Sequence, residues 1–315
     1  MGAFMVEDAV REKLFMSVAL IGASGSGKTL SALLLAKGVI RSKYPELSEN
    51  SPEFWAKIGV VDTEHRRSRL YADTSLTGEF IGRFKTIDFT EPYTTDRYRE
   101  AVEALIKIGV EVIIIDSLSH AWEGEGGILE LQQSLGGRYQ DWKTVKPFIR
   151  DFYRTLTEKD VHIISTIRTK QEYQVDTSAT GQLKVTKLGL KPIQKDDIEF
   201  ELQIAWSMDM EHVATATKDN SGLFDGNPKR LSVEDGGAIY AWVEEGKDMS
   251  EEKEKQRLVY VDKMRVYVEN PNILVQDKVS KYVAHAKVKF GVSDDFTTYP
   301  IGVLKPMVDA LERVL

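Results

Sequence analysis

The sequence predicts an α/β domain with a mostly parallel central sheet, an antiparallel hairpin extension and a small helical region at the C-terminus. Four strand-like, mainly apolar runs alternate with helical patterns and lie at 15–21, 58–62, 110–116 and 161–166. A glycine-rich segment joins the first of these runs to a helix. After Arg168 the pattern changes to period-two segments, which predict hairpins in place of helical crossovers.

The elements of the α/β part follow one another in a regular order. Residues 5–14 are expected to form a short amphipathic helix or an arm. The first helix should end near Lys43, because Tyr44-Pro45 stops it. Segment 84–89 alternates as an edge strand does, whereas 110–116 is apolar almost throughout and should be buried on both faces. The remaining expected helices are 94–107, 128–135 and 144–159.

Beyond Arg168 the expected elements are mainly antiparallel. They are a hairpin of 171–177 with 182–188, a second pair of 199–208 with 212–218, and a short helix at 238–244. The whole chain is therefore divided into an N-terminal helix or arm (1–14), an α/β core (15–246) and a charged linker with a helical region (247–315).

Composition narrows the function classes. The chain is 42% hydrophobic and 29% charged, and no apolar run approaches the roughly 18–20 residues of a membrane span. The absence of cysteine excludes disulfide frameworks, thiolate zinc sites and cysteine nucleophiles. A net charge of −7 argues against general coating of polyanions, so nucleic-acid contact must be a local patch. We expect a cytoplasmic protein that does not contact a membrane.

Residues 22–29, Gly-Ala-Ser-Gly-Ser-Gly-Lys-Thr, have the spacing G-x-x-x-x-G-K-[ST] of a P-loop. Glycines allow backbone N–H groups to surround a phosphate, and the following helix adds its positive N-terminal end. Lys28 is expected to reach the β- and γ-phosphates, and the Thr29 hydroxyl is expected to bind Mg²⁺. This segment contributes the predicted nucleotide-binding residues Gly22, Ser24, Gly25, Ser26, Gly27, Lys28, Thr29 and Leu30.

Two carboxylates follow core strands on the same side of the predicted sheet. Asp116 ends the strand 110–116, where it can hold the Mg²⁺ shell and contact the nucleotide site, an arrangement known as Walker B. Glu64 lies just past the strand 58–62 and is the candidate that orients the water attacking the γ-phosphate. Asp62 is expected to close this strand and support the loop.

Several of these segments resemble the RecA family. The run from Asp62 to Ala72 is similar to a segment in which a glutamate polarises water and a tyrosine stacks on adenine. The runs 112–117 and 165–168 resemble its Walker B strand and the stretch leading into its second DNA-binding loop. Over about residues 15–245 the chain looks like phage-encoded RecA-core ATPases of the Sak type, which are linked to single-strand annealing and recombination.

This resemblance implies a RecA-like core that binds ATP with Mg²⁺ and hydrolyses it. It implies that Glu64 is the catalytic carboxylate, that Tyr71 is the adenine platform and that Lys218 reaches the γ-phosphate of a neighbouring subunit. The implied partners are single-stranded DNA, further copies in a filament or ring, and a single-stranded-DNA-binding protein, in the host cytoplasm if the chain is phage-encoded. Thr166 stands where RecA has a γ-phosphate-sensing glutamine, which leaves the coupling of ATP to DNA open.

The expected DNA surface is the segment 168–195, whose six basic and two acidic residues give a local charge of +4. Tyr173 could stack a base, and the other predicted contacts are Arg168, Lys170, Lys184, Lys187 and Lys191. The glycine-rich loops 123–127 and 136–139 are a second candidate. No base-reading motif is visible, so binding should not depend on DNA sequence.

Three functions remain open at this point. The first is a DNA-stimulated ATPase that acts as a recombinase or annealing protein. The second is a RecA-fold motor of the helicase or packaging type, although such motors usually bring an additional domain. The third is a nucleotide switch or small-molecule kinase, but the chain has no N-K-x-D run for guanine and no recognisable arginine-bearing lid. Neither oligomer number nor the role of residues 256–315 follows from the sequence.

Overall fold

The computed structural model describes residues 8–177, 183–194, 198–290 and 292–312; for 171–177, 183–190, 250, 253 and 289 it describes the backbone alone. The chain divides into two compact units. The first spans Leu14–Glu245, and the second combines the N-terminal segment up to Lys13 with the region from Gly246 onwards.

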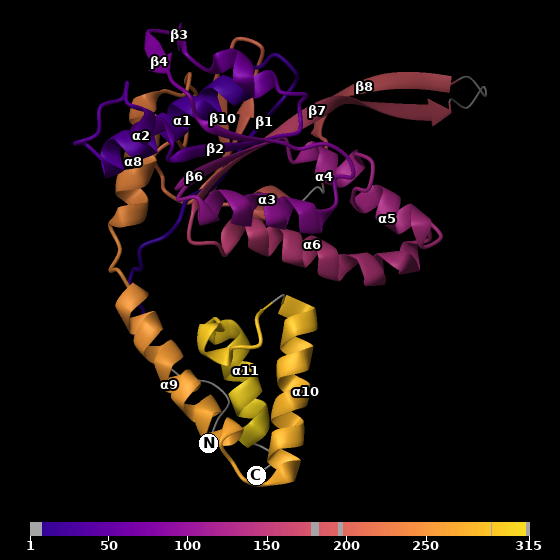
Figure 1. Cartoon of the computed structure of the whole chain (residues 1–315). Helices are drawn as coiled ribbons and strands as arrows, with labels where there is room; N and C mark the ends of the chain where they lie inside the picture. Colours follow the sequence, from indigo (N-terminus) through magenta and orange to yellow (C-terminus); the bar gives the residue numbers. More distant parts are fainter. Residues whose placement is uncertain (1–7, 178–182, 195–197, 291, 313–315) are drawn as a thin grey trace. The chain divides into compact units, whose positions relative to one another are not determined.

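The first unit is built on a sheet whose strands run in the order β10-β9-β1-β7-β6-β2-β5, with β8 paired to β7 (Figure 1). All neighbours are parallel except β10 with β9 and β8 with β7. The predicted mostly parallel α/β fold with an antiparallel hairpin extension is therefore confirmed. The strands are β1 (Ser17–Gly22), β2 (Ile58–Asp62), β5 (Lys85–Asp88), β6 (Val112–Asp116), β7 (His162–Thr177), β8 (Leu183–Pro192), β9 (Ile204–Met208) and β10 (Ala214–Asp219).

Helices cover both faces of this sheet and bury two separate cores. On β6, Ile114 faces one core, whereas Ile113 and Ile115 face the other, so this strand is buried on both faces as predicted. Figure 1 shows α1, α2 and α8 on one face and α3 and α6 on the other. The helices are α1 (Lys28–Lys43), α2 (Pro52–Trp55), α3 (Thr95–Lys107), α4 (Ser119–Glu123), α5 (Ile128–Ser134), α6 (Trp142–Thr157), α7 (Ile198–Glu201) and α8 (Val233–Glu244), with short 3₁₀ turns η1 (Arg67–Tyr71) and η2 (Tyr139–Asp141).

Helices α1 and α8 meet backbone against backbone. A Cβ atom on Gly38 would lie 1.9 Å from the carbonyl oxygen of Val233, and one on Gly236 would lie 2.1 Å from that of Leu35. No side chain larger than hydrogen fits at either position. The N-terminus of α8 is therefore held directly against the helix that follows the glycine-rich loop.

Two expected elements differ from the structure because of local packing and capping. The stretch predicted as the start of a strand at 199 is the short helix α7; Ile198 and Leu202 are both buried and stand four residues apart, which is helical spacing. Helix α8 begins at Val233 and not at 238, because Ser232 and Asp235 form a capping box there.

Two further differences concern strands and the N-terminal segment. Strand β7 does not end at Thr166 but continues without a break into the hairpin with β8. A small separate hairpin of β3 (Thr74–Leu76) and β4 (Glu79–Ile81) was not expected. Residues 8–14 contain no helix, and Glu12 forms an isolated bridge with Lys247 within the second unit, as an arm does.

The second unit is helical, as predicted. Helices α9 (Ser250–Val268), α10 (Ile273–Phe290) and α11 (Ile301–Glu312), with the 3₁₀ turn η3 (Phe296–Thr298), enclose a core of their own. Its most buried members are Met264, Tyr299, Leu304 and Val308. Across the described residues of both units, every helix is too short or too polar to cross a bilayer.

Stability of the first unit should decrease on mild acidification because of His162. Its Nδ1 accepts a hydrogen bond from the Met16 amide at 3.0 Å, so the buried ring is neutral. Burial, with a smaller contribution from Lys43, lowers the pKa of His162 to about 4, from about 6.5 in an unfolded chain. The unfolded state therefore takes up the proton first, and stability is lost as the pH falls from about 6.5 to about 4, by up to about 3 kcal/mol.

Urea unfolding at pH 7, 6 and 5, followed by tryptophan fluorescence, measures this loss, since all five tryptophans lie in this unit. His162→Asn keeps an acceptor near the Nδ1 position and should reduce the pH dependence of the unfolding free energy. His285→Asn changes an exposed ring on α10 and should leave that dependence as it is. Equal pH slopes for His162→Asn and the unaltered protein would contradict the role assigned to His162.

Candidate functional site

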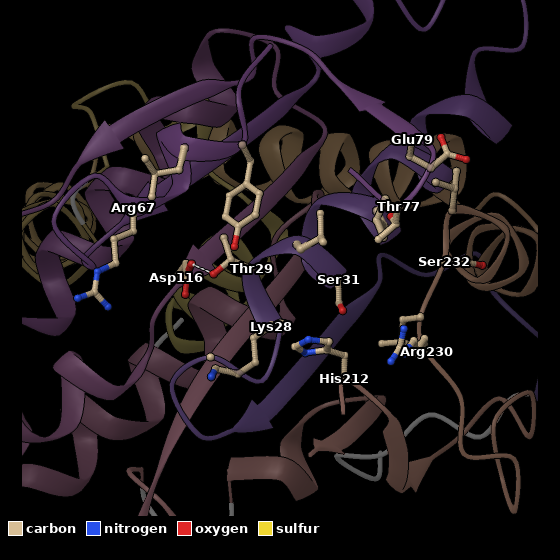
Figure 2. Close-up of a pocket in the computed structure, with 18 of the residues that line it drawn as sticks. Lys28, Thr29, Ser31, Arg67, Thr77, Glu79, Asp116, His212, Arg230 and Ser232 are labelled. Carbon is tan, nitrogen blue, oxygen red and sulfur yellow. Dashed lines mark hydrogen bonds between the residues drawn. The ribbon is translucent and has the colours of Figure 1, made fainter. Parts of the chain in front are cut away.

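A cavity of about 720 Å³ lies at the carboxyl ends of the parallel strands. Ligands bind at this edge of open α/β sheets because the loops after the strands meet there. Figure 2 shows Lys28, Asp116 and Arg67 toward one side of the cavity, and Thr77, Glu79, Arg230 and Ser232 toward the other. The predicted residues that line the cavity are Ser24, Gly25, Gly27, Lys28, Thr29, Leu30, Glu64, Tyr71, Asp116 and Arg168.

The glycine-rich loop adopts a conformation that requires its glycines. Gly25 and Gly27 have φ angles of 87° and 89°, in the left-handed region that favours glycine. Gly22 and Ser26 do not line the cavity but shape the loop, since a Cβ atom on Gly22 would lie 2.6 Å from the Ser26 hydroxyl. The loop ends where α1 begins, so the positive end of that helix faces the cavity.

Lys28 lies buried across this loop. Its Nζ donates to the carbonyl oxygens of Gly22 and Ala23 at 2.9 and 2.7 Å and to the Ser26 hydroxyl at 3.5 Å. Burial lowers the pKa of Lys28, although the nearby carboxylates of Asp116 and Glu64 oppose this. The ammonium is thus held at the loop by weak neutral acceptors, which a phosphate oxygen can replace with a charge-assisted hydrogen bond.

Asp116 accepts two hydroxyl hydrogen bonds at the end of β6. Thr29 donates to its Oδ2 at 2.6 Å, and Thr166 on β7 donates to its Oδ1 at 2.5 Å. Figure 2 shows the bond that joins Thr29 to Asp116. The sequence left the role of Thr166 open; in the structure its hydroxyl is hydrogen-bonded to Asp116.

The donor set fits Mg²⁺. Asp116 is buried, and no lysine or arginine in the described part of the chain forms an ion pair with it. Burial raises the pKa of Asp116, although the hydrogen bonds from the two threonine hydroxyls lower it. Because burial disfavours the anion, a nearby cation would stabilise it. With the Thr29 hydroxyl beside it, the group offers hard oxygen ligands. The described residues hold no cluster of three or more His, Asp or Glu that could bind a metal without phosphate or water oxygens.

Glu64 projects into the cavity from the loop after β2. Ser117 donates to its Oε1 at 3.2 Å, and Arg168 lies 3.6 Å from the same oxygen. Arg67 lies 4.0 Å from Oε2. The carboxylate is therefore oriented from two sides near Asp116, which suits a group that positions water for attack on a phosphate.

The loop that carries Glu64 is fixed by Asp62, as expected. Its Oδ1 accepts from the Glu64 amide at 2.8 Å, and its Oδ2 accepts from the amide and hydroxyl of Ser68 at 2.9 and 2.5 Å. All these contacts are local, so Asp62 positions the loop and does not face the cavity.

Of the two further residues whose roles the resemblance implies, Tyr71 lines the cavity and Lys218 does not. Tyr71 is half-buried at the end of η1; its predicted role as the adenine platform stays a prediction. Lys218 lies outside the cavity of its own chain, on the outermost strand β10, and donates to the carbonyl oxygen of Phe200 at 2.5 Å. Its predicted role toward a neighbouring subunit remains a prediction.

The structure adds cavity residues that sequence reasoning missed. His212, in the turn between β9 and β10, lies against the glycine-rich loop: its Nδ1 is 2.9 Å from the position of a Cβ on Gly27. Arg230 donates to the carbonyl oxygen of Glu211 at 3.1 Å and lines the same wall. Nothing local marks these residues, because they reach the loop from a part of the chain almost 200 positions away.

The predicted DNA-binding residues are only partly described. Arg168 lines the cavity beside Glu64, and Lys170 pairs with Glu123 of α4 at 2.9 Å. Lys191 lies near the base of the hairpin and is partly exposed. The side chains of Tyr173, Lys184 and Lys187 lie outside the described residues.

Fold and cavity together define a P-loop nucleoside triphosphatase, in which strand, loop and helix hold the phosphates. Residues 14–229 match the model of the family described as "AAA domain", and the chain belongs to that family. Membership supports nucleotide binding, typically with Mg²⁺, and ATPase activity in general. A comparison with curated proteins finds no match.

Proposed function

We propose that the protein is an ATP-dependent, single-stranded-DNA-binding protein of the recombinase or annealing type, in which ATP is hydrolysed at subunit interfaces. The continuity of β7 is the observation that carries the proposal. Thr166 and Arg168 on this strand contact Asp116 and Glu64 at the cavity, and the same strand continues into the hairpin with β8. One strand therefore carries residues of the nucleotide site and also forms part of the predicted basic surface.

Hydrolysis at a subunit interface is supported by the place of Lys218. It lies on an edge strand of the sheet, and among the described residues its Nζ donates to a backbone carbonyl of α7. An edge strand can approach a second copy, and a cation supplied in trans can stabilise charge on a transferring phosphate. The expected assembly is a homo-oligomer, a filament or a ring.

The second candidate DNA loop also has suitable chemistry. Tyr139 is 93% exposed at the loop between α5 and α6, which suits a platform for base stacking and not a core role. Lys143 and Lys146 follow on α6; both are exposed, and within the described residues neither has an ion-pair partner. A stacking ring with free cations nearby is the pattern that binds single strands without reading their sequence.

The direct test measures ATP hydrolysis with and without single-stranded DNA, together with images of particles in ATP. We expect DNA to accelerate hydrolysis several-fold and ATP to promote filaments or rings. An ATPase whose rate ignores DNA, and which binds no DNA in the presence of ATP, would overturn the proposal. Unwinding of a forked duplex would favour a motor instead.

Tyr139→Ala should weaken binding of single-stranded DNA by roughly 5- to 150-fold, since a base stacked on an aromatic ring contributes about 1–3 kcal/mol. Fluorescence anisotropy of a labelled oligonucleotide in the presence of ATP measures the change. Tyr139→Phe retains the stacking face and should bind as the unaltered protein does. If Tyr139→Ala keeps full affinity, DNA follows another surface.

A further inference from the structure

The β3–β4 hairpin forms one wall of the cavity although it is not part of the main sheet. Thr77, at its turn, and Glu79, at the start of β4, both line the cavity. An isolated two-stranded hairpin is marginally stable in water, so its position must come from contacts with the rest of the unit. Those contacts are concentrated on its second strand, where Ile81 is buried in the core and Phe80 packs edge-on against Trp55 with ring centroids 6.3 Å apart.

The strongest of these contacts comes from Lys37 in the middle of α1. This side chain is only 2% exposed, and its Nζ lies 2.5 Å from Oε2 of Glu79, 2.8 Å from Oε2 of Glu49 and 3.1 Å from the carbonyl oxygen of Phe80. Three acceptors match the three N–H donors of an ammonium group. A lysine is rarely buried unless it is paired in this way, and here two of its acceptors belong to β4.

Arg41, one turn later on α1, extends the cluster to the start of α8. It contacts Glu49 at 2.5 Å, Glu79 at 3.4 Å and Glu234, at the start of α8, at 3.5 Å. Burial alone would raise the pKa of Glu49, but hydrogen bonds from Arg41 and Lys37 outweigh it and lower that pKa. The cluster joins the hairpin to α1, and the close contact of α1 with α8 fixes the start of α8 beside it.

The two ends of the cavity differ in chemistry. At one end the glycine-rich loop supplies amides and Lys28, and Asp116 and Glu64 lie beside it, which suits phosphates and their cation. The other end combines the apolar Leu34, Leu231 and Val233 with the hydroxyls of Ser31, Thr77 and Ser232, and it also carries the charged Glu79, Arg230 and Glu234. Apolar surface with hydroxyl groups suits a base and a sugar, and two carboxylates against one guanidinium do not favour a phosphate.

We infer that the β3–β4 hairpin is the wall against which the nucleoside half of the nucleotide packs, and that Lys37 and Glu79 are positioning residues that hold this wall. The inference rests on the proposed nucleotide-binding function and adds a structural element, the hairpin, that contacts the nucleoside alone. A ligand that lacks base and sugar does not reach the hairpin. Disrupting the cluster must therefore lower the affinity for ATP and leave the affinity for inorganic tripolyphosphate unchanged.

The test compares both ligands, each with Mg²⁺, by isothermal titration calorimetry. Glu79→Gln keeps the size of the side chain but removes the charge that faces Lys37 and Arg41; we expect the Kd for ATP to rise about tenfold and that for tripolyphosphate to stay within twofold. In steady-state assays the KM for ATP should rise while kcat changes by less than twofold.

A second variant reaches the wall without touching the cluster. Thr77→Gly suits the φ of 55° at this position and removes the side chain from the cavity. It should therefore weaken ATP binding about threefold and leave tripolyphosphate binding unchanged. The matched control is Asp73→Asn. It removes the exposed ion pair between Asp73 and Arg83, whose atoms lie 2.5 Å apart at the end of the same hairpin away from its turn, and it should change the affinity for neither ligand.

The outcomes separate the inference from the function on which it rests. If the unaltered protein binds neither ATP nor tripolyphosphate, the nucleotide-binding function itself fails. If it binds both, and Glu79→Gln and Thr77→Gly bind ATP as tightly as it does, the inference is wrong and the function stands. An equal loss for both ligands would also overturn the inference, because it would show that the hairpin acts on the phosphate end.

Discussion

Replacing Glu64 with glutamine is expected to reduce the rate of ATP hydrolysis by about 10²–10⁴-fold while ATP still binds. The amide keeps the shape of the side chain and an oxygen that can accept from Ser117, 3.2 Å away. It cannot take a proton from water, however, and it no longer balances Arg168 and Arg67 beside the cavity. Single-turnover hydrolysis, with ATP affinity measured separately by calorimetry, distinguishes the two effects.

Glu100→Gln, on α3, is a matched control for this variant. It makes the same chemical change on an exposed glutamate that does not line the cavity, and it should hydrolyse ATP at the normal rate. Near-normal turnover in Glu64→Gln would assign water activation to another group and would leave Glu64 as a purely structural carboxylate beside Ser117.

Replacing Lys28 with alanine is expected to weaken ATP binding by about 10²-fold or more, because charge-assisted hydrogen bonds to phosphate contribute about 1.5–3 kcal/mol each. The present partners of Lys28 are two carbonyls and a hydroxyl of the loop itself. Water that enters the cavity can satisfy those groups when the lysine is removed. The fold should therefore be retained, with little change in the melting temperature of the protein without ligand.

Calorimetry with Mg·ATP and thermal unfolding without nucleotide check both parts of this expectation. Lys107→Ala, at the exposed end of α3, removes the same charge away from the cavity and should bind ATP normally. ATP affinity in Lys28→Ala within a few-fold of normal would mean that the phosphates do not lie in the glycine-rich loop.

The phosphate end of the site was predictable from sequence because each of its parts lies in a continuous, strongly patterned segment. The loop after β1, Asp116 at the end of β6 and Glu64 just past β2 all follow apolar strands whose ends are visible in the sequence. In a parallel sheet such ends meet at one edge, so their proximity follows from the fold class alone. The bond from Thr29 to Asp116 joins residues 87 positions apart.

The remaining walls of the cavity were not predictable in the same way. His212 and Arg230 reach the cavity because β9 and β10 extend the sheet beside β1, an arrangement that no local pattern encodes. The hairpin with Thr77 is too short to give a clear period-two signal, and its place depends on Lys37, a charged residue in the middle of an otherwise ordinary helix. Burial of a lysine is decided by partners far away in the chain, and a sequence read alone cannot show them.

Strand β7 has a mechanical consequence. Thr166, which touches Asp116, and Thr177, at the far end of the strand, are separated by eleven residues of extended chain, about 36 Å at roughly 3.3 Å per residue. An extended backbone hardly lengthens under load, because its bonds and angles are stiff. The pairing with β8 shifts register between Glu172 and Tyr173, where a strand can bend, so a displacement of Thr166 would be carried along one backbone as far as that point.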